Sequence, residues 1–209
     1  MAAPVRRAYQ RRNSRPAIGL AVVLVAAVVA IWTVMLTSAS QGPSDTICPP
    51  PAAAPAGLPA PGVVQPGTAL DEVAPAPPNL VRIRVLNGGG QRGQANLVAS
   101  QLGELGLTEA ADPGNDPYYP NGDLACRGDI RYGPKGAAAA RTVSLVLPCL
   151  ALVQDDRADD AVDVAIGTLF GEVNPGRAAR NILDQLNGPG DKPPPIEPEL
   201  LATARSVPC

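Results

Sequence analysis

The segment LVRIRVLNGGGQRGQANLVASQLGELG, residues 80–106, decides the fold of this chain. Within residues 81–85, three apolar side chains alternate with two arginines, which is the period of a half-buried strand. Glycines at 88–90 interrupt this run, and apolar residues then recur at helical spacing as far as Leu105. Gly106 stands where a left-handed C-terminal cap is expected. The segment therefore predicts a strand, a glycine loop and a helix, in that order.

Similar patterns follow along the chain. They predict strands at 129–133 and 161–167 with a weaker one at 107–110, and helices at 134–147, 177–186 and 197–206. Strands that alternate with helices predict an α/β fold, here a small sheet of three or four strands with helices on one face. Right-handed β-α-β connections would make the connected strands parallel. We assign this α/β domain to residues 80–170 and a C-terminal helical extension to 171–209.

The N-terminal residues have the pattern of a membrane anchor. Residues 1–16 carry five arginines and no acid, and residues 17–36 contain no charge. About twenty apolar residues suffice to cross the hydrocarbon core, and positive charge marks the cytoplasmic side. We therefore predict a cytoplasmic basic tail at 1–16, a single transmembrane helix at 17–37 and an extracytoplasmic C-terminal domain. The small residues at 38–40 leave a cleaved signal peptide open, although the length of the apolar run favours the uncleaved anchor.

Residues 38–79 are rich in proline, alanine and glycine without apolar periodicity, and they predict a linker. Cysteines occur only on the exported side of the predicted anchor, at Cys48, Cys126, Cys149 and Cys209, and an even number there predicts two disulfides. Cys126 precedes the strand at 129–133, and Cys149 follows the helix that returns from it. Since both then lie at the same end of one strand-helix unit, we pair Cys126 with Cys149 and Cys48 with Cys209.

Composition excludes several classes of function. The net charge is −2, but residues after 37 carry 12 Lys and Arg against 19 Asp and Glu, a net of −7. An acidic exported part argues against nucleic-acid binding. The chain contains no histidine, which removes the commonest general base and zinc ligand, and no C-x-x-C motif. We predict no cofactor, no metal site and no catalytic residues.

The glycine loop is the candidate binding site. It fits the G-x-G-x-x-G pattern between a strand and a helix, which dinucleotide sites share. A tight turn needs glycine for steric reasons alone, and we favour that interpretation over a dinucleotide site in an exported domain. A generic anion pocket at the helix N-terminus is the intermediate hypothesis. Its residues would be Gly88, Gly89, Gly90, Gln91 and Arg92.

An acidic run at residues 155–163 contains five aspartates. Clustered carboxylates could hold a divalent cation or act as a paired acid and base. The spacing matches no calcium loop, so a solvated loop leading into a strand is the favoured interpretation. The alternative function is a metal-assisted enzyme that uses the acidic run at 155–163. In the loop before the strand at 129–133, Tyr118 and Tyr119 are predicted to pack the loop down rather than to bind a ligand.

The segments VLNGGG at 85–90, IRYG at 130–133 and VDVAIG at 162–167, with the intervening helix pattern, resemble the LytR C-terminal domain family over residues 80–170. The layout of basic tail, anchor, proline linker and four cysteines further resembles mycobacterial envelope-integrity proteins. In this family the domain often accompanies a catalytic domain that transfers glycopolymers to peptidoglycan, a domain we do not find here. The resemblance implies a non-enzymatic envelope protein of an actinobacterium. Our own hypothesis for the partner is peptidoglycan, a lipid-linked glycan or an envelope-assembly enzyme, and the alternative metal-assisted enzyme would act in envelope glycopolymer metabolism.

Overall fold

The computed structural model describes residues 24–25, 27–29, 47–51, 57–188, 195–207 and 209. The chain divides into two units, residues 1–42 and 43–209, and the fold below is that of the second. The predicted tail at 1–16 and most of the predicted transmembrane helix lie outside the described residues. The described residues between 24 and 29 are helical. No helix within the described ranges has the length and apolarity that a membrane span requires.

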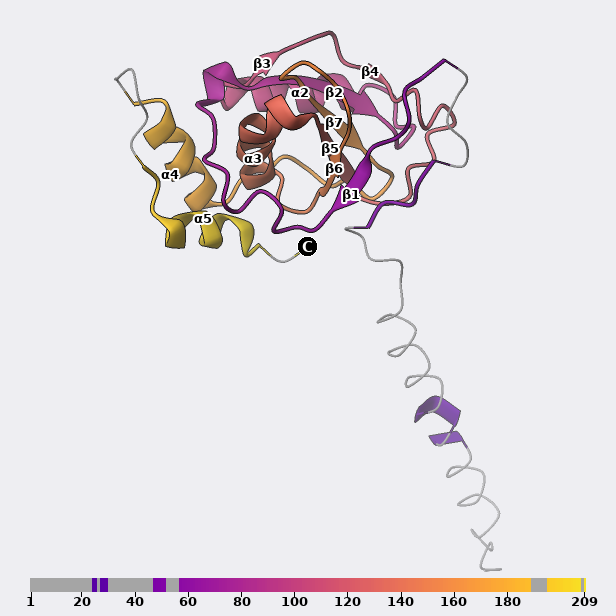
Figure 1. The fold of residues 1–209 in the computed structure, drawn as a ribbon. Coiled ribbons are helices and arrows are strands. Elements are labelled where there is room, and N and C mark those ends of the chain that lie inside the picture. The colour runs from indigo at the N-terminus through magenta and orange to yellow at the C-terminus, as the bar shows by residue number, and fades with distance from the viewer. Residues whose placement is uncertain (1–23, 26, 30–46, 52–56, 189–194, 208) are drawn as a thin grey trace, which may run out of the picture. The chain divides into compact units, whose positions relative to one another are not determined.

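A mixed seven-stranded sheet organises residues 43–209 (Figure 1). Its strands are β1 (Val63–Gln65), β2 (Arg82–Asn87), β3 (Thr108–Glu109), β4 (Gly114–Asn115), β5 (Gly128–Tyr132), β6 (Ala151–Gln154) and β7 (Val162–Ile166). The order is β1-β6-β5-β7-β2-β3, and β4 pairs with the end of β2. β2 runs parallel to β3, β4 and β7, and β5 runs parallel to β6. The β5–β7 and β1–β6 pairs are antiparallel.

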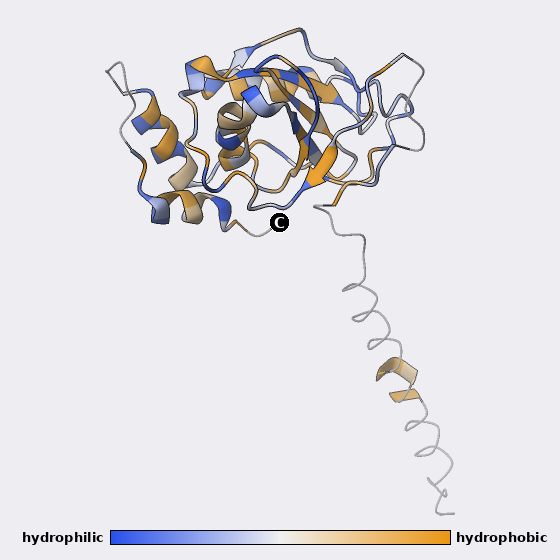
Figure 2. Ribbon diagram, viewed as in Figure 1, coloured by the Kyte–Doolittle hydropathy of each residue, from blue (hydrophilic) through white to orange (hydrophobic). Residues whose placement is uncertain are grey.

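Helices pack on one face of this sheet, as the sequence predicts. They are α2 (Gln94–Glu104), α3 (Ala137–Val146), α4 (Arg177–Leu186) and α5 (Pro198–Arg205), with short 3-10 turns η1 (Pro78–Leu80) and η2 (Pro134–Gly136). α2 and α3 cover the sheet, and α4 and α5 pack against α3 (Figure 1). Figure 2 shows apolar residues along the strands and helices that meet in this layer. The core is aliphatic and includes Ile83, Val85, Ile130, Val164, Ile166, Val98, Leu102 and Val143.

The first strand, its helix and their cap have the predicted arrangement. The glycine loop connects the end of β2 to the start of α2. Gly106, which follows α2, has a φ of 90°, the left-handed conformation expected after a helix. The amide of Leu107 then donates to the carbonyl of Leu102, which satisfies one of the last helical carbonyls.

The predicted number of three or four strands is wrong. β6 escapes detection because Leu152 and Val153 point to opposite faces and are both buried, so the strand shows no apolar-polar alternation. β4 has two residues and β1 has three, too few to show a period. β1 also corrects the predicted linker at 38–79, because it pairs with β6 and Leu70 beyond it is 3% exposed.

The two disulfides join Cys48 to Cys126 and Cys149 to Cys209, so the predicted pairing is wrong although all four cysteines are bonded. Asp129 in β5 is paired with Ala151 in the parallel strand β6. Cys126 and Cys149 precede these two strands, so both lie at the same edge of the sheet, as the sequence predicts. That shared end does not decide the pairing, because residues 47–51 and the C-terminus also reach it. Residues 47–51 bring Cys48 to Cys126, and the C-terminus brings Cys209 to Cys149.

Candidate functional site

The sheet face opposite the helices carries charged side chains in register. Arg84 in β2 pairs with Asp163 in β7, and Asp163 pairs with Arg131 in β5. Asp129 lies two residues before Arg131 and therefore on the same face. We call this surface the charged face. Loop residues 116–124 and 47–51 cover part of it and form a small apolar cluster with Leu86, Ala165 and the Cys48–Cys126 disulfide.

Arg131 lies at the centre of the covered part. Its guanidinium binds Asp116 through two hydrogen bonds, with Nη1–Oδ1 and Nη2–Oδ2 distances of 3.0 and 2.6 Å. Asp129 lies against the same guanidinium, with its Oδ1 2.7 Å from Nε. All three side chains are at most 7% exposed. Because buried charges must be paired to be tolerated, this triad fixes where β5 and the loop at Asp116 meet.

A second group of charges continues the face toward β2. Asp163 accepts hydrogen bonds from Arg84 Nε and Nη2 at 2.9 and 2.7 Å and from Arg157 Nη2 at 2.9 Å. Arg157 also binds Asp155 through Nε and Nη2, at 2.8 and 2.6 Å. Together the two groups contain the three arginines Arg84, Arg131 and Arg157 and the four aspartates Asp116, Asp129, Asp155 and Asp163. One carboxylate is therefore in excess.

The protonation equilibria reflect these contacts. Burial raises the pKa of Asp129 to about 6, even though the charge of Arg131 opposes the shift. Burial would also raise the pKa of Asp163, but hydrogen bonds from Arg84 and Arg157 outweigh it and hold the pKa below its ordinary value. For Arg131, burial lowers the pKa, but the carboxylates of Asp129 and Asp116 outweigh burial, so the pKa is raised. Asp129 is therefore more easily neutralised near physiological pH than an ordinary carboxylate.

A pocket opens above the triad. Its floor contains Asp129, Arg131 and Asp155, and its cavity measures about 90 Å³. Arg131 lies 5.1 Å from the ring centroid of Tyr118 and 5.9 Å from that of Tyr119, within cation–π distance. The remaining walls are mostly apolar and come from Pro49, Pro50, Pro51, Pro61, Val64 and Val153. We call this cavity the Asp129 pocket.

Both tyrosines tie the proline segments to the loop. The hydroxyl of Tyr119 donates to the carbonyl of Pro49 at 2.6 Å, and that of Tyr118 donates to the carbonyl of Pro59 at 3.1 Å. Burial raises the pKa of Tyr119 to about 12. The prediction that the tyrosines pack the loop agrees with these contacts, and the same rings also line the Asp129 pocket.

The glycine loop has close backbone contacts that explain its composition. A Cβ on Gly88 would lie 2.9 Å from Leu124, and one on Gly89 would lie 2.7 Å from the carbonyl group of Gly167. The amide of Gly88 donates to the carbonyl of Ile166. The amide of Gly89 donates to Oδ1 of Asn87, which leaves two of the loop's amides engaged internally.

Gly90 adopts a φ of 75°, in the left-handed region, and Arg92 is exposed. Gln91 offers its carbonyl to Nδ2 of Asn87 at 2.7 Å. Binding of an anion by residues 88–92 stays a prediction.

Four of the five aspartates in the acidic run at 155–163 interact with arginines or with a backbone amide. Asp155 and Asp163 bind Arg157, Asp160 lies 3.3 Å from Arg82, and the carboxylate of Asp159 accepts from the amide of Ala161. Within the described part of the chain, no three Cys, Asp or Glu side chains are grouped so that they could hold a metal ion.

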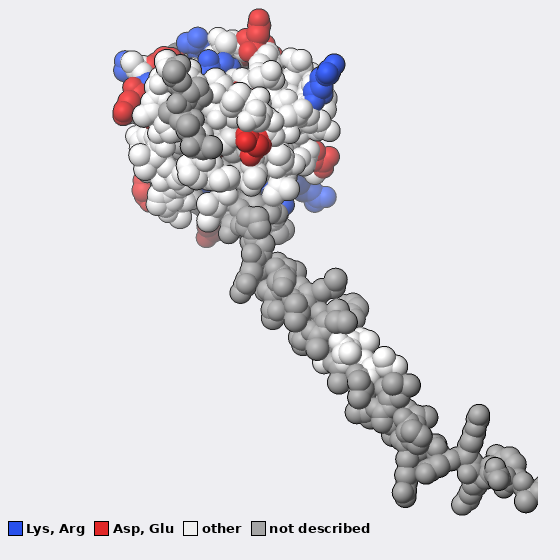
Figure 3. Space-filling model, turned by 90° about the vertical axis from the view of Figure 1, so that its right-hand side faces the viewer, with Lys and Arg blue, Asp and Glu red and all other residues white. Residues whose placement is uncertain are grey.

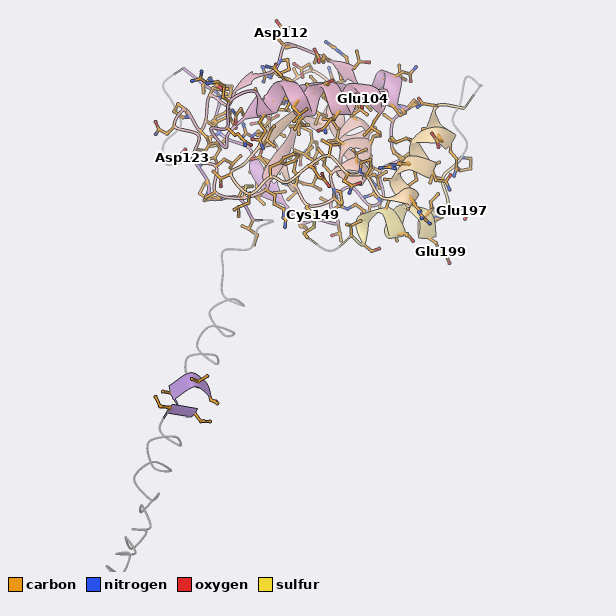
Figure 4. All side chains as sticks on the ribbon, turned by 180° about the vertical axis from the view of Figure 1, so that it is seen from behind. Glu104, Asp112, Asp123, Cys149, Glu197 and Glu199 are labelled. Atoms are coloured by element: carbon orange, nitrogen blue, oxygen red, sulfur yellow. A yellow bond between two sulfur atoms is a disulfide. The ribbon has the colours of Figure 1, made fainter. Side chains whose placement is uncertain are left out.

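Surface acids are also dispersed. Figure 4 shows the labelled acids at the periphery of the folded unit. Glu104, Asp112 and Asp123 lie well apart, whereas Glu197 and Glu199 lie near each other at the start of α5. In the view of Figure 3, charged side chains of both signs lie mainly around the margin and form no large patch of one sign.

The charged face was missed because the sequence gives only a local sign of it. Charges alternate with apolar residues within β2, β5 and β7, at Arg84, Asp129, Arg131 and Asp163. That alternation predicts polar side chains on the face away from the helices. Their convergence depends on the strand order, and the burial of Arg131 depends on the loop at Asp116.

Three comparisons with known proteins each find a relative of this chain. The model of the family described as LytR cell envelope-related transcriptional attenuator matches residues 80–170. The cell envelope integrity protein Cei of Mycobacterium tuberculosis is 37% identical over 207 residues, which cover 97% of this chain and 93% of that protein. A crystal structure of the soluble domain of a conserved hypothetical secreted protein from Mycobacterium marinum is 38% identical, with a TM-score of 0.65. The match covers 71% of this chain and 98% of that one.

Proposed function

This chain belongs to the family that includes the cell envelope integrity protein Cei, and we propose that it is a membrane-anchored, extracytoplasmic, non-enzymatic binding or scaffold protein that supports envelope integrity. The observation that carries the proposal is the extent of the match to Cei, which runs over 97% of the chain and so includes the predicted anchor as well as the folded domain. The relative of known structure is described as secreted, which supports an exported domain.

The charged face supports a framework role for the domain. Its carboxylates lie against guanidinium groups, and such pairs fix the positions of strands and loops more than they supply reactive groups. A rigid face of this kind suits recognition, because little ordering cost remains when a partner binds. The candidate partners are peptidoglycan, a lipid-linked glycan or an envelope-assembly enzyme.

The Cys48–Cys126 disulfide supports a position close to the membrane. It fixes Cys48 to the folded domain, so that only residues 38–47 separate the domain from the predicted anchor. At full extension these residues span at most about 40 Å. The domain would act at the outer surface of the membrane and the innermost part of the wall.

A complementation experiment tests the proposal. A strain that lacks the gene should become sensitive to detergent and to envelope-directed antibiotics, and the full chain should restore resistance. A chain whose residues 1–37 are replaced by a cleavable signal peptide is the matched control, and it should restore resistance poorly if anchoring matters. Normal resistance without the gene would refute the envelope role, and full rescue by the control would refute the anchor.

Binding is tested in the same strains. Crosslinking in membranes, followed by sedimentation with insoluble wall, should recover the full chain with wall material or with an envelope enzyme. Turnover of a purified glycopolymer by the full chain would contradict the non-enzymatic assignment.

A further inference from the structure

The Asp129 pocket combines apolar walls with an acidic floor. The charged residues that line it are Asp129, Asp155 and Arg131. Asp155 is also paired with Arg157, and the two ion-paired groups together leave one carboxylate in excess. The donors of Arg131 are directed at Asp116 and Asp129, which leaves this cation little capacity for an external anion. The floor therefore favours a ligand that brings hydrogen-bond donors and positive charge.

An acceptor without a hydrogen bond supports the same conclusion. Oδ1 of Asp129 lies 2.7 Å from Nε of Arg131, yet it accepts no hydrogen bond, and the residue is 4% exposed. The ion pair with Arg131 offsets part of the desolvation of this oxygen, which can still accept a hydrogen bond from a further donor. The raised pKa of Asp129 agrees with this, because burial penalises the charged form more than the charge and hydrogen bond of Arg131 favour it.

The size and walls of the pocket restrict the ligand further. A cavity of about 90 Å³ is well below the roughly 300 Å³ of the smallest sites for drug-sized ligands, so only the end of a chain can enter. Three prolines at 49–51, together with Val64 and Val153, offer apolar contact to methylene groups. An alkyl stem that ends in an ammonium group matches both parts, because such side chains lie along apolar surface while the charged end finds polar partners.

We propose that the Asp129 pocket binds the end of an alkylammonium chain, with its ammonium group near Asp129 and Asp155 and its methylene groups against the prolines and valines. The ligand would be the side chain of a diamino acid residue in a peptide. This deepens the proposed function by naming a ligand chemistry, and it rests on that proposal only for the assumption that the pocket faces envelope peptides. An aminoalkyl lipid headgroup shares the ammonium but carries a phosphate that an acidic floor repels.

The test is a calorimetric titration of the full-length protein, solubilised in detergent, with small probe molecules. The probe is Nα-acetyl-lysine amide, the neutral control is Nα-acetyl-norleucine amide, and phosphoethanolamine represents the headgroup. We expect saturable binding of the lysine probe and at least tenfold weaker binding of the other two. Equal affinity for lysine and norleucine probes, or stronger binding of phosphoethanolamine, would overturn the proposal.

Two variants at adjacent positions of β1 locate the site. Val64 is 54% exposed and lines the pocket, whereas Val63 is 68% exposed and does not line it. Val64→Phe should therefore weaken lysine-probe binding at least tenfold by filling the mouth, and Val63→Phe should leave it unchanged. Both positions are exposed, so neither variant depends on repacking a core. Asp129→Asn should remove the preference for lysine over norleucine.

Binding that survives Val64→Phe would place the lysine site elsewhere and refute the assignment. The titration uses no wall material, so its failure would leave the complementation result of the envelope proposal untouched. A failed complementation would likewise leave a positive titration standing.

Discussion

The face of the sheet that packs against α2 and α3 is lined by aliphatic side chains, whereas the opposite face carries three arginines and four aspartates in two ion-paired groups. Residues from the same strands build both faces, since Ile130 and Arg131 are neighbours in β5 and Val162 and Asp163 are neighbours in β7. β5 and β7 are buried on both faces, although only one of these faces is apolar.

The two faces should respond differently to substitution. Apolar burial is non-directional, so the helix face tolerates replacements that conserve volume. Each guanidinium on the charged face requires acceptors at defined positions, and removal of one partner leaves a buried charge behind. We infer that the helix face supplies most of the stabilisation, while the charged face fixes the strand register and the position of the covering loops.

The largest expected effect belongs to Arg131→Met. This change leaves Asp116 and Asp129 buried without their partner and should lower the free energy of unfolding by about 3 to 5 kcal/mol. Urea unfolding followed by circular dichroism measures it. Leu102→Ala, which truncates a fully buried residue of the helix face, is the control and should cost about 2 to 5 kcal/mol.

A further variant separates charge from packing at this site. Replacing Arg131, Asp116 and Asp129 together by Met and two Leu residues should recover much of the loss, because no charge is then left unpaired. Exposed ion pairs contribute less than about 1 kcal/mol. If Arg131→Met lowers the free energy of unfolding by no more than that, the Arg131–Asp116–Asp129 triad does not behave as a buried group of charges.

The disulfides give the next largest effect. Cys48→Ser with Cys126→Ser opens a loop with a sequence separation of 78 and should lower stability by about 2 to 4 kcal/mol. The matched control is Cys149→Ser with Cys209→Ser, whose separation of 60 predicts nearly the same chain-entropy term.

The two double variants should differ in proteolysis. Only loss of the Cys48–Cys126 bond releases residues 47–51 from the charged face, so only that variant should become sensitive to cleavage before residue 62. Equal cleavage in both variants would mean that the proline segment is held without its disulfide.

A pH dependence follows from Asp129. Its pKa is about 6 in the folded protein and near 3.8 in the unfolded chain, so the folded state binds the proton more tightly. The protonated group therefore contributes stability below about pH 4, and this contribution is lost as the pH rises through about 6. The full loss amounts to about 3 kcal/mol as an upper figure.

Asp129→Asn isolates this contribution, because asparagine does not titrate. Thermal unfolding between pH 4 and 7 should show the stability of the unmodified protein falling relative to the variant. Parallel pH profiles for the two proteins would refute the assignment of the shift to Asp129.

The helix face was predictable because its signals are local. Apolar alternation placed β2 and β7, helical spacing placed α2 and α4, and Gly106 marked the end of α2. These patterns depend only on residues a few positions apart. They failed for β6, where burial on both faces removes the alternation on which the method depends.

The charged face and the disulfides were not predictable in this way because they join distant residues. Arg84 and Asp163 lie 79 positions apart and meet only because β7 pairs with β2. Cys48 and Cys126 are 78 positions apart, and their pairing depends on how residues 47–51 cross the charged face. The sequence shows that such residues exist, but it does not give the strand order that brings them together.

The smallest expected effect lies at the margin of the charged face. Arg82 and Asp160 are 3.3 Å apart, and their side chains are 51% and 54% exposed, whereas Arg131 is 7% exposed. Exposed pairs of this kind contribute about 0.2 to 1 kcal/mol and are screened by salt. Arg82→Ala should therefore change the free energy of unfolding by less than about 0.5 kcal/mol, and the difference should vanish in 1 M NaCl. Arg84→Ala, which removes one of two partners of the buried Asp163, should lie between Arg82→Ala and Arg131→Met. If burial by the covering loops gives the charged face its rigidity, the three costs must rise in that order. A loss at Arg82 comparable to that at Arg131 would mean that the network acts as one unit irrespective of solvent exposure.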